Sequence, residues 1–437
     1  MENGAWDRLL LGARGLAVLR GILRSSTVRD FLSLLELLER EKPDPASVAD
    51  VFGRLWEGLA LEPDRLLPDA WQSHLVGRLL DDENPFSLNA ERGTLTPAVL
   101  EQGRRDLRTL RSLFDLDAPT LLAAVEDAVP ELSGLWVPWT GSDPEAKSPR
   151  HAVARKLAAA GRWEDCAELV AGYHARHGAG AFGRGRAFRW EDGRLLAVPH
   201  HDPARLSGLV GYEREREPLI RNTERFLVGL PAHHALLYGL PGTGKSSTVK
   251  AVLNEYADRG LRLVEVAKED LAGLPRVLDA LRGRSPRFIL FVDDLSFEEH
   301  EVEYKALKAL LEGSVAEPPE NVRVYATSNR RNIVRESFSE RDGAGDGAGS
   351  DDVHARDTMQ EKLSLVARFG LRLTFPPPDR QLYLEIVAGL ARERGLEIPA
   401  AELAERAALW DQWHAGRSGR TARQFVDDLE AELADPG

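Results

Sequence analysis

Hydrophobic residues in the first third of the chain recur at three- and four-residue spacing. Leucine-rich runs at 31–39 and 107–114, interleaved with charged residues, are the clearest examples. This period is typical of amphipathic helices, and the proline-containing turns at 42–45, 62–64 and 84–85 separate them. The pattern predicts a mainly α-helical N-terminal domain over residues 1–140, without a chemical motif, which serves as a scaffold or docks a partner or substrate.

A polar stretch rich in Pro, Gly and Ser follows at 140–149, and we predict a linker and helical connector over 141–205. Residues 178–190 mix glycines with arginines and aromatics, as a surface for single-stranded nucleic acid does. A flexible connector anchored by its aromatic residues is the favoured interpretation, because no strand–helix frame surrounds these glycines.

Beyond Leu209, short apolar runs alternate with helical stretches. The predicted strands are 235–238, 261–266, 287–292, 322–327 and 371–375, and helices are predicted at 246–256, 271–281 and 304–312. This alternation predicts a five-stranded parallel sheet covered on both faces, in an α/β core over 206–377. A low-complexity insertion occupies 341–352, and helices return over 378–437.

The first predicted strand runs into a glycine-rich turn and then a helix, with the spacing G-x-x-x-x-G-K-S. Glycines allow backbone N–H groups to converge on one anion, and the N-terminus of the helix adds donors and a positive dipole end. Lys245 would reach the β- and γ-phosphates, and the Ser246 hydroxyl would complete a magnesium shell. We therefore predict a nucleoside triphosphate site that involves Gly239, Pro241, Gly242, Thr243, Gly244, Lys245, Ser246 and Ser247.

Polar residues end two further predicted strands. The strand 287–292 runs into Asp293 and Asp294, and the strand 322–327 is followed by Asn329. Because ligands of parallel sheets bind beyond the carboxyl ends of the strands, these side chains face the triphosphate. We expect Asp293 to hold magnesium and Asp294 to polarise the attacking water. An amide at Asn329 can orient that water or sense the γ-phosphate.

With these residues, the chain from Leu209 onward resembles the AAA+ ATPases, which implies ATP and Mg²⁺ as cofactors. More narrowly, stretches at 261–266, 288–298, 304–308, 325–331, 361–370 and 418–425 resemble a bacterial family of AAA+-type ATP-binding proteins known only as a domain of unknown function. The match runs from about Gly180 to the C-terminus. The resemblance implies an α/β P-loop NTPase fold with strand order 5-1-4-3-2 and a C-terminal helical lid.

The resemblance also assigns roles to single residues. Val210 and Gly211 would line the adenine pocket, and Asn329 would be the sensor 1 residue. Arg368 would be the arginine finger that completes the site of a neighbouring subunit, with Arg330 as the second candidate. For sensor 2 the choice lies between Arg420, which fits better, and Arg423. Each of these arginines could instead form a salt bridge or lie on a solvated helix face.

One feature departs from the AAA+ pattern: Asp294 stands where most active members have glutamate. Aspartate is one methylene shorter, so a water placed for glutamate could lie too far away. Either hydrolysis is slow, or Glu298 supplies the base from the next loop.

Composition narrows the class of protein. The 437 residues carry a net charge of −13 and a single cysteine, Cys166, so an intramolecular disulfide is excluded and a reducing cytoplasm is expected. No apolar run is long enough for a membrane span. The acidic balance, with no helix-turn-helix or zinc motif, disfavours nucleic acid as the partner.

The leading hypothesis is a Mg-ATP-dependent AAA+ ATPase that assembles as a homo-oligomeric ring and remodels or loads a protein partner. A threading motor is disfavoured, because residues 267–274 contain no aromatic pore-loop residue. The alternatives are a nucleotide-gated binding module with little turnover and an ATP-dependent loader that works on DNA.

Overall fold

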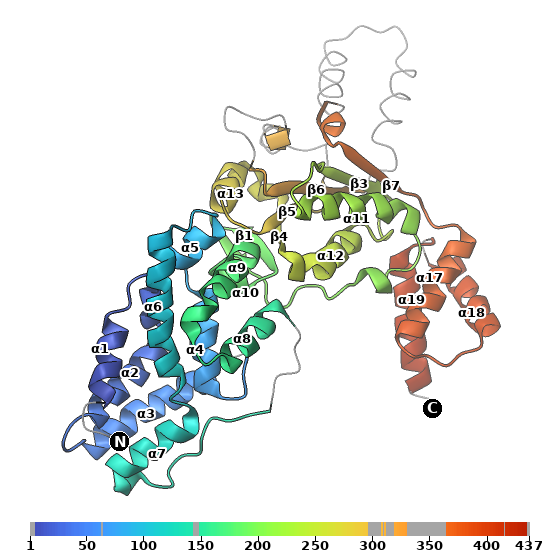
Figure 1. Cartoon of the computed structure of the whole chain (residues 1–437). Helices are drawn as coiled ribbons and strands as arrows, with labels where there is room; N and C mark the ends of the chain where they lie inside the picture. The colour runs from blue at the N-terminus through green and yellow to red at the C-terminus, as the bar shows by residue number, and fades with distance from the viewer. Residues whose placement is uncertain are drawn as a thin grey trace. The chain divides into compact units, whose positions relative to one another are not determined.

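The computed structural model describes residues 5–62, 64–142, 148–295, 307–308, 310–311, 319–329, 364–414 and 416–434. Its contacts divide the chain into two compact units (Figure 1): Met1–Arg184 with Arg284–Pro286, and Gly185–Gly283 with Arg287–Gly437. Glu298, Arg330, the insertion 341–352 and most of the predicted helix 304–312 lie outside the described residues.

The first unit is helical, as its sequence period predicts. Its helices are α1 (Ala5–Arg14), α2 (Ser26–Leu38), α3 (Pro45–Ala60), α4 (Ala70–Asp81), α5 (Pro85–Glu91), α6 (Pro97–Phe114), α7 (Ala118–Ala128), α8 (Pro149–Ala159), α9 (Ala167–His177) and α10 (Ala181–Arg184). Several of these helices begin in the same way: a capping side chain lies just before the helix, and a proline occupies the first helical position. Asp44 caps α3 in this way and Asn84 caps α5, where the missing proline N–H costs nothing.

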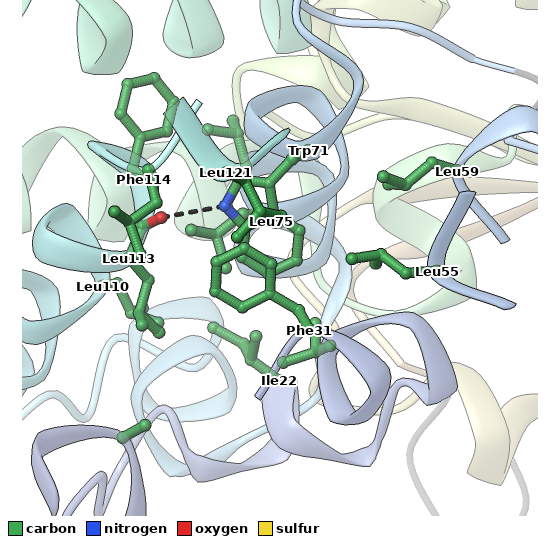
Figure 2. Close-up of a cluster of buried hydrophobic side chains, with 14 of the residues drawn as sticks. Ile22, Phe31, Leu55, Leu59, Trp71, Leu75, Leu110, Leu113, Phe114 and Leu121 are labelled. Carbon is green, nitrogen blue, oxygen red and sulfur yellow. Dashed lines mark hydrogen bonds between the residues drawn. The ribbon is translucent and has the colours of Figure 1, made fainter. Parts of the chain in front are cut away.

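Aliphatic side chains, most of them leucine, pack around a few large aromatic rings in the core of this unit (Figure 2). The rings of Phe31 on α2 and Trp71 on α4 are stacked with centroids 3.6 Å apart, and both are fully buried. Trp71 Nε1 donates to the carbonyl oxygen of Leu113 at 2.9 Å, so its single polar group is satisfied inside an apolar core.

The predicted linker and helical connector, 141–205, contains helices α8 and α9 but does not form a unit of its own. Helices α8 and α9 contribute Leu157 and Val170 to the helical core, and Trp163 between them is part of the same core. Residues 187–191 form strand β1, in which Phe188 and Trp190 are buried. The connector therefore divides between the two units at residues 184–185.

The second unit is built on one sheet of seven strands. They are β1 (Ala187–Glu191), β2 (Arg194–Ala197), β3 (Ala235–Gly239), β4 (Leu261–Val266), β5 (Arg287–Val292), β6 (Val322–Ser328) and β7 (Leu371–Phe375), in the order β2-β1-β4-β5-β6-β3-β7. The prediction of a purely parallel, five-stranded sheet is wrong. The sheet continues past β4 into β1 and then β2, which pairs antiparallel with β1, so neither the count nor the complete order is the predicted one. The five predicted strands are consecutive within it, as β7-β3-β6-β5-β4, and among themselves they are parallel and keep the predicted order 5-1-4-3-2.

Helices accompany the sheet and continue beyond it. They are α11 (Glu213–Leu227), α12 (Lys245–Tyr256), α13 (Leu274–Leu281), α17 (Arg380–Glu393), α18 (Ala400–Trp413) and α19 (Gly419–Ala434). Helix α12 packs on β3, β4 and β6, and α17 packs on α18 and α19. A single apolar cluster runs from strand residues such as Leu237 to Val387 and Phe425 of the C-terminal helices. Among the described residues, no helix is both long and apolar enough to span a membrane.

Candidate functional site

Two glycines, Gly239 at the end of β3 and Gly244 just before α12, have different structural roles. Gly244 immediately precedes α12 and has φ +87°, in the left-handed region. Gly239, with φ +152°, lies so close to β7 that a Cβ atom would be 2.1 Å from the carbonyl oxygen of Phe375. Glycine at 239 is therefore required by the packing of β3 against β7.

Lys245 begins α12 and its side chain turns back onto the loop. Nζ donates to the carbonyl oxygens of Gly239 and Leu240, both at 2.8 Å, and to Asn329 Oδ1 at 3.1 Å. Burial lowers the pKa of this ammonium to about 8, while the nearby Asp294 and Asp293 carboxylates oppose that shift. The hydrogen-bond partners of the Lys245 ammonium are neutral carbonyl and amide oxygens, so this cation is suited to bind an anionic ligand.

Asp293 follows β5 and accepts two short hydrogen bonds on one oxygen. Ser246 Oγ and Thr327 Oγ1 both donate to Asp293 Oδ1 at 2.6 Å. Ser246 and Asp293 thus present oxygen ligands side by side, next to Lys245, as a small hard cation requires. The residues predicted to hold magnesium fit that ion.

Asp294 has an unusual backbone, with φ +53°. Its N–H donates to Thr327 Oγ1 at 2.8 Å. Its Oδ1 accepts from Asn329 Nδ2 at 2.5 Å, and its Oδ2 lies 3.6 Å from Lys268 Nζ. The predicted base and the predicted sensor are therefore in direct contact, and Asp294 also has a lysine partner that the sequence did not indicate.

These groups surround a cavity of about 450 Å³ in the second unit. Of the predicted residues, those that line it are Val210, Pro241, Gly242, Thr243, Gly244, Lys245, Ser246, Ser247, Asp293, Asp294, Asn329, Arg420 and Arg423. Gly211 and Gly239 do not line it. Gly211 instead packs against α17, where a Cβ atom would lie 2.4 Å from Leu382 Cδ1, and Gly239 packs against β7.

Apolar side chains also line this cavity. They are Leu209, Val210, Phe375, Ile386 and Leu390. Val210 is packed so closely on α17 that a Cβ atom at Gly389 would be 2.2 Å from Val210 Cγ2. This apolar lining suits a flat, apolar group, as the polar residues of the loop suit phosphates.

Arg216 also lines the cavity, and its guanidinium donates to the Leu209 carbonyl oxygen at 2.7 Å. Burial lowers the pKa of Arg216, whereas Glu213, 3.1 Å away, raises it. This bond ties the segment before α11 to the helix that follows it.

The three candidate arginines that the structure describes differ in their positions. Arg420 and Arg423, on α19, are exposed and line the cavity. Within the part of the chain that the structure describes, neither forms an ion pair. The N-terminus of α19 contacts the loop between β3 and α12 directly, because the Gly419 N–H donates to the Gly242 carbonyl oxygen at 2.7 Å. Arg368 is exposed just before β7 and does not line the cavity.

Residues 183–433 match the family described as Protein of unknown function (DUF815), which is more than half of the chain. The chain belongs to this family. The match spans the sheet, the cavity and the C-terminal helices, so every candidate site residue lies inside the DUF815 region. The predicted resemblance to a family of unknown function is confirmed.

Other proteins are similar to parts of the DUF815 chain. The replication factor C large subunit of Thermofilum pendens is 33% identical over 124 residues, covering 26% of this chain and 29% of that subunit. The RuvB Holliday junction branch migration motor of Thermotoga maritima is 19% identical, with a TM-score of 0.36, over 53% of this chain and 66% of that one. A single-residue mutant of that motor gives 19% identity and a TM-score of 0.35, over 54% and 67%. The chain spans less than a third of the length of the replication factor subunit.

Sequence reasoning missed several residues of the site. Thr327, Lys268 and Arg216 each contact a predicted element of the site. A threonine inside a strand and single charged residues in helical segments give no motif signal. The strand-end position of Thr327, two residues before Asn329, was the only available indication.

Proposed function

We propose that this chain binds Mg-ATP in the cavity and hydrolyses it to ADP and phosphate. The observation that carries the proposal is the convergence of Lys245, Ser246, Asp293, Asp294 and Asn329 around one cavity at the N-terminus of α12. A helix N-terminus, a buried lysine and paired oxygen ligands are together the requirements of a magnesium triphosphate.

Each residue has a distinct task in this proposal. Lys245 leaves the carbonyl oxygens of its own loop for the β- and γ-phosphates, which are far stronger partners. Ser246 and Asp293 would hold magnesium, which supplies charge neutralisation at the phosphates. Asp294 takes the proton of the attacking water, and Asn329 positions that water.

The α19 arginines complete the phosphate end of the site. Arg420 and Arg423 line the cavity without an ion-pair partner among the described residues, so either can meet the γ-phosphate. We assign this role to Arg420, which follows directly after the Gly419–Gly242 contact. Closure of α17–α19 on the nucleotide would then couple phosphate contact to a movement of the helices.

Arg368 cannot serve its own cavity in the same way, because it is exposed and does not line it. We propose that Arg368 completes the site of a neighbouring subunit, in a homo-oligomeric ring, and stabilises charge on the transferring phosphoryl group. Such a ring would use hydrolysis to remodel or load a protein partner held by the N-terminal helices.

A second candidate function is a nucleotide-gated binding module with little turnover. The contacts of Asp294 favour it, because Asn329 and Lys268 occupy both carboxylate oxygens of the short side chain that would act as base. In that case ATP binding alone changes the position of the helices.

Assembly mass and phosphate release, measured together with and without Mg-ATP, test the proposal. Wild type, Lys245→Ala and Arg368→Ala are compared with Arg372→Ala, a matched control whose arginine is exposed four residues away on β7 and lines no part of the cavity.

ATP-dependent oligomers with turnover lost in Lys245→Ala and Arg368→Ala, but kept in Arg372→Ala, are the expected result. Mixing Arg368→Ala with Lys245→Ala should then restore part of the activity, because a finger acts on the adjacent subunit. A monomer that binds ATP tightly and releases no phosphate would support the gated module instead. Absence of nucleotide binding by wild type would overturn both.

A further inference from the structure

We infer that Thr327 is a positioning residue that fixes the metal-binding and the base carboxylates relative to each other. The inference rests on the proposed function of this cavity. It starts from one buried hydroxyl on β6: Thr327 lines the cavity and is 1% exposed.

Thr327 holds three consecutive residues of the turn that follows β5. Its Oγ1 donates to Asp293 Oδ1 at 2.6 Å and accepts from the Asp294 N–H at 2.8 Å. Its carbonyl oxygen accepts from the Leu295 N–H at 2.7 Å. A single residue of the neighbouring strand β6 therefore fixes the backbone and the side-chain direction of the turn that carries both carboxylates.

The chemistry of a hydroxyl explains why threonine is suited to this position. A hydroxyl has one proton, and here it is given to Asp293, which leaves the oxygen lone pairs for the Asp294 N–H. Asp294 has φ +53°, a conformation that non-glycine residues hold only when their surroundings impose it. The bond from its N–H to Thr327 is one of the contacts that impose it.

The contact with Asp293 gains importance when the site is loaded. In the structure Ser246 and Thr327 donate to the same oxygen, Asp293 Oδ1. If Ser246 joins a magnesium shell, as we propose, its bond to Asp293 is lost. Thr327 then remains to orient that carboxylate toward the ion, as outer-shell partners of metal ligands commonly do.

The chain supplies its own control at the next residue. Ser328 is also 1% exposed and also carries a hydroxyl, but its Oγ is buried without a hydrogen-bond partner among the described residues. Removing the Ser328 hydroxyl therefore changes buried polarity at the same strand end without touching either carboxylate.

The experiment compares wild type with Thr327→Val, Thr327→Ser and Ser328→Ala. Turnover, the KM for ATP and the Mg²⁺ concentration at half-maximal activity are measured, together with binding of a fluorescent ATP analogue in EDTA and over a Mg²⁺ titration. Thr327→Val keeps the shape and removes the hydroxyl, whereas Thr327→Ser keeps the hydroxyl.

We expect Thr327→Val to lose about 10- to 100-fold in turnover, the effect of one charge-assisted hydrogen bond. Its Mg²⁺ midpoint should rise, while analogue binding in EDTA stays within about twofold, because the phosphate loop is unchanged. Thr327→Ser should recover to within about threefold, and Ser328→Ala should match wild type.

Two results would overturn the inference. One is Thr327→Val with turnover and Mg²⁺ midpoint both near wild type. The other is Thr327→Ser as impaired as Thr327→Val, since the methyl group and packing would then matter and the hydroxyl would not. If wild type binds the analogue but releases no phosphate, the Mg²⁺ midpoint of binding still decides the role of Thr327, while the proposed hydrolysis fails separately.

Discussion

Proton uptake on ATP binding is a sharp test of the environment of Lys245. Burial lowers the pKa of its ammonium to about 8, against the opposing effect of Asp294 and Asp293. At pH 8, about half of the free molecules therefore carry a neutral Lys245, and at pH 7 only about a tenth do. The groups that face Nζ are these two carboxylates, the Asn329 amide and two loop carbonyl oxygens.

Triphosphate binding adds negative charge beside Nζ, which favours the ammonium and raises its pKa. We therefore expect an uptake of about 0.5 proton per ATP bound at pH 8, falling to about 0.1 at pH 7. If ATP binds only the charged form, affinity falls about tenfold between pH 7 and pH 9.

Isothermal titration calorimetry in buffers of different protonation enthalpy measures this uptake directly. The Lys245→Arg variant is the control, because its guanidinium stays charged over this range and should take up no proton. A binding enthalpy of wild type at pH 8 that is independent of the buffer would refute the reasoning. In the free protein the folded pKa lies below the unfolded value of 10.5, so unfolded chains bind more protons between about pH 8 and 10.5 and stability should rise with pH in that window.

Three further predictions test other parts of the site. Asp294→Asn should bind ATP and trap it, with phosphate release reduced about 100-fold or more if Asp294 is the base; hydrolysis at the wild-type rate would show that it is not. Gly239→Ala should lower the free energy of unfolding by about 3 kcal/mol or more, since its Cβ meets a backbone oxygen at 2.1 Å. Gly244→Ala, whose Cβ meets nothing within 4 Å, should cost only about 1–2 kcal/mol of left-handed strain, and equal losses in urea unfolding would contradict this contrast. Lys268→Ala should raise basal phosphate release about two- to fivefold by freeing one Asp294 oxygen, an ordinary size for a half-exposed ion pair. Lys250→Ala, which removes an ion pair of the same 3.6 Å length to Asp202, should leave it unchanged.

The sequence predicted the inner strands well because each is a short apolar run with a clear end. The run 287–292, for example, is β5 without a change of boundary. Strands β1 and β2 were missed because both are short and neither is a continuous apolar run: Arg189 lies inside β1, Glu191 ends it, and Arg194 begins β2. Their strand character comes from pairing with a distant segment, Ala187–Trp190 against Leu263–Val266, which no local pattern contains.

The same contrast holds for the site: local sequence spacing predicts some of its residues, and the pairing of distant strands determines the others. The spacing from Gly239 to Ser246 is local, so Lys245 and Ser246 could be placed from the sequence, and both line the cavity. The role of a motif glycine is harder to predict from the sequence. Gly239 has the spacing of the phosphate loop, but glycine is needed there because any side chain would collide with the Phe375 carbonyl oxygen. Which residues meet Asp293 and Asp294 depends on the β5–β6 pairing, and this information is not local.

That pairing also changes how the Asp293–Asp294 departure from the AAA+ pattern is understood. From the sequence alone, the short side chain of Asp294 is only a loss of reach toward a water. In the structure its reach is set by a backbone at φ +53° and by the Thr327 hydroxyl, and its carboxylate is already engaged by Asn329 and Lys268. The decisive quantity is then how easily these two partners release Asp294, rather than the length of its side chain. Because Asn329 also accepts from Lys245, a phosphate bound at Lys245 would remove one partner from Asn329 and loosen its contact with Asp294. We therefore expect turnover that is slow but measurable, which distinguishes a restrained ATPase from a site that cannot hydrolyse at all.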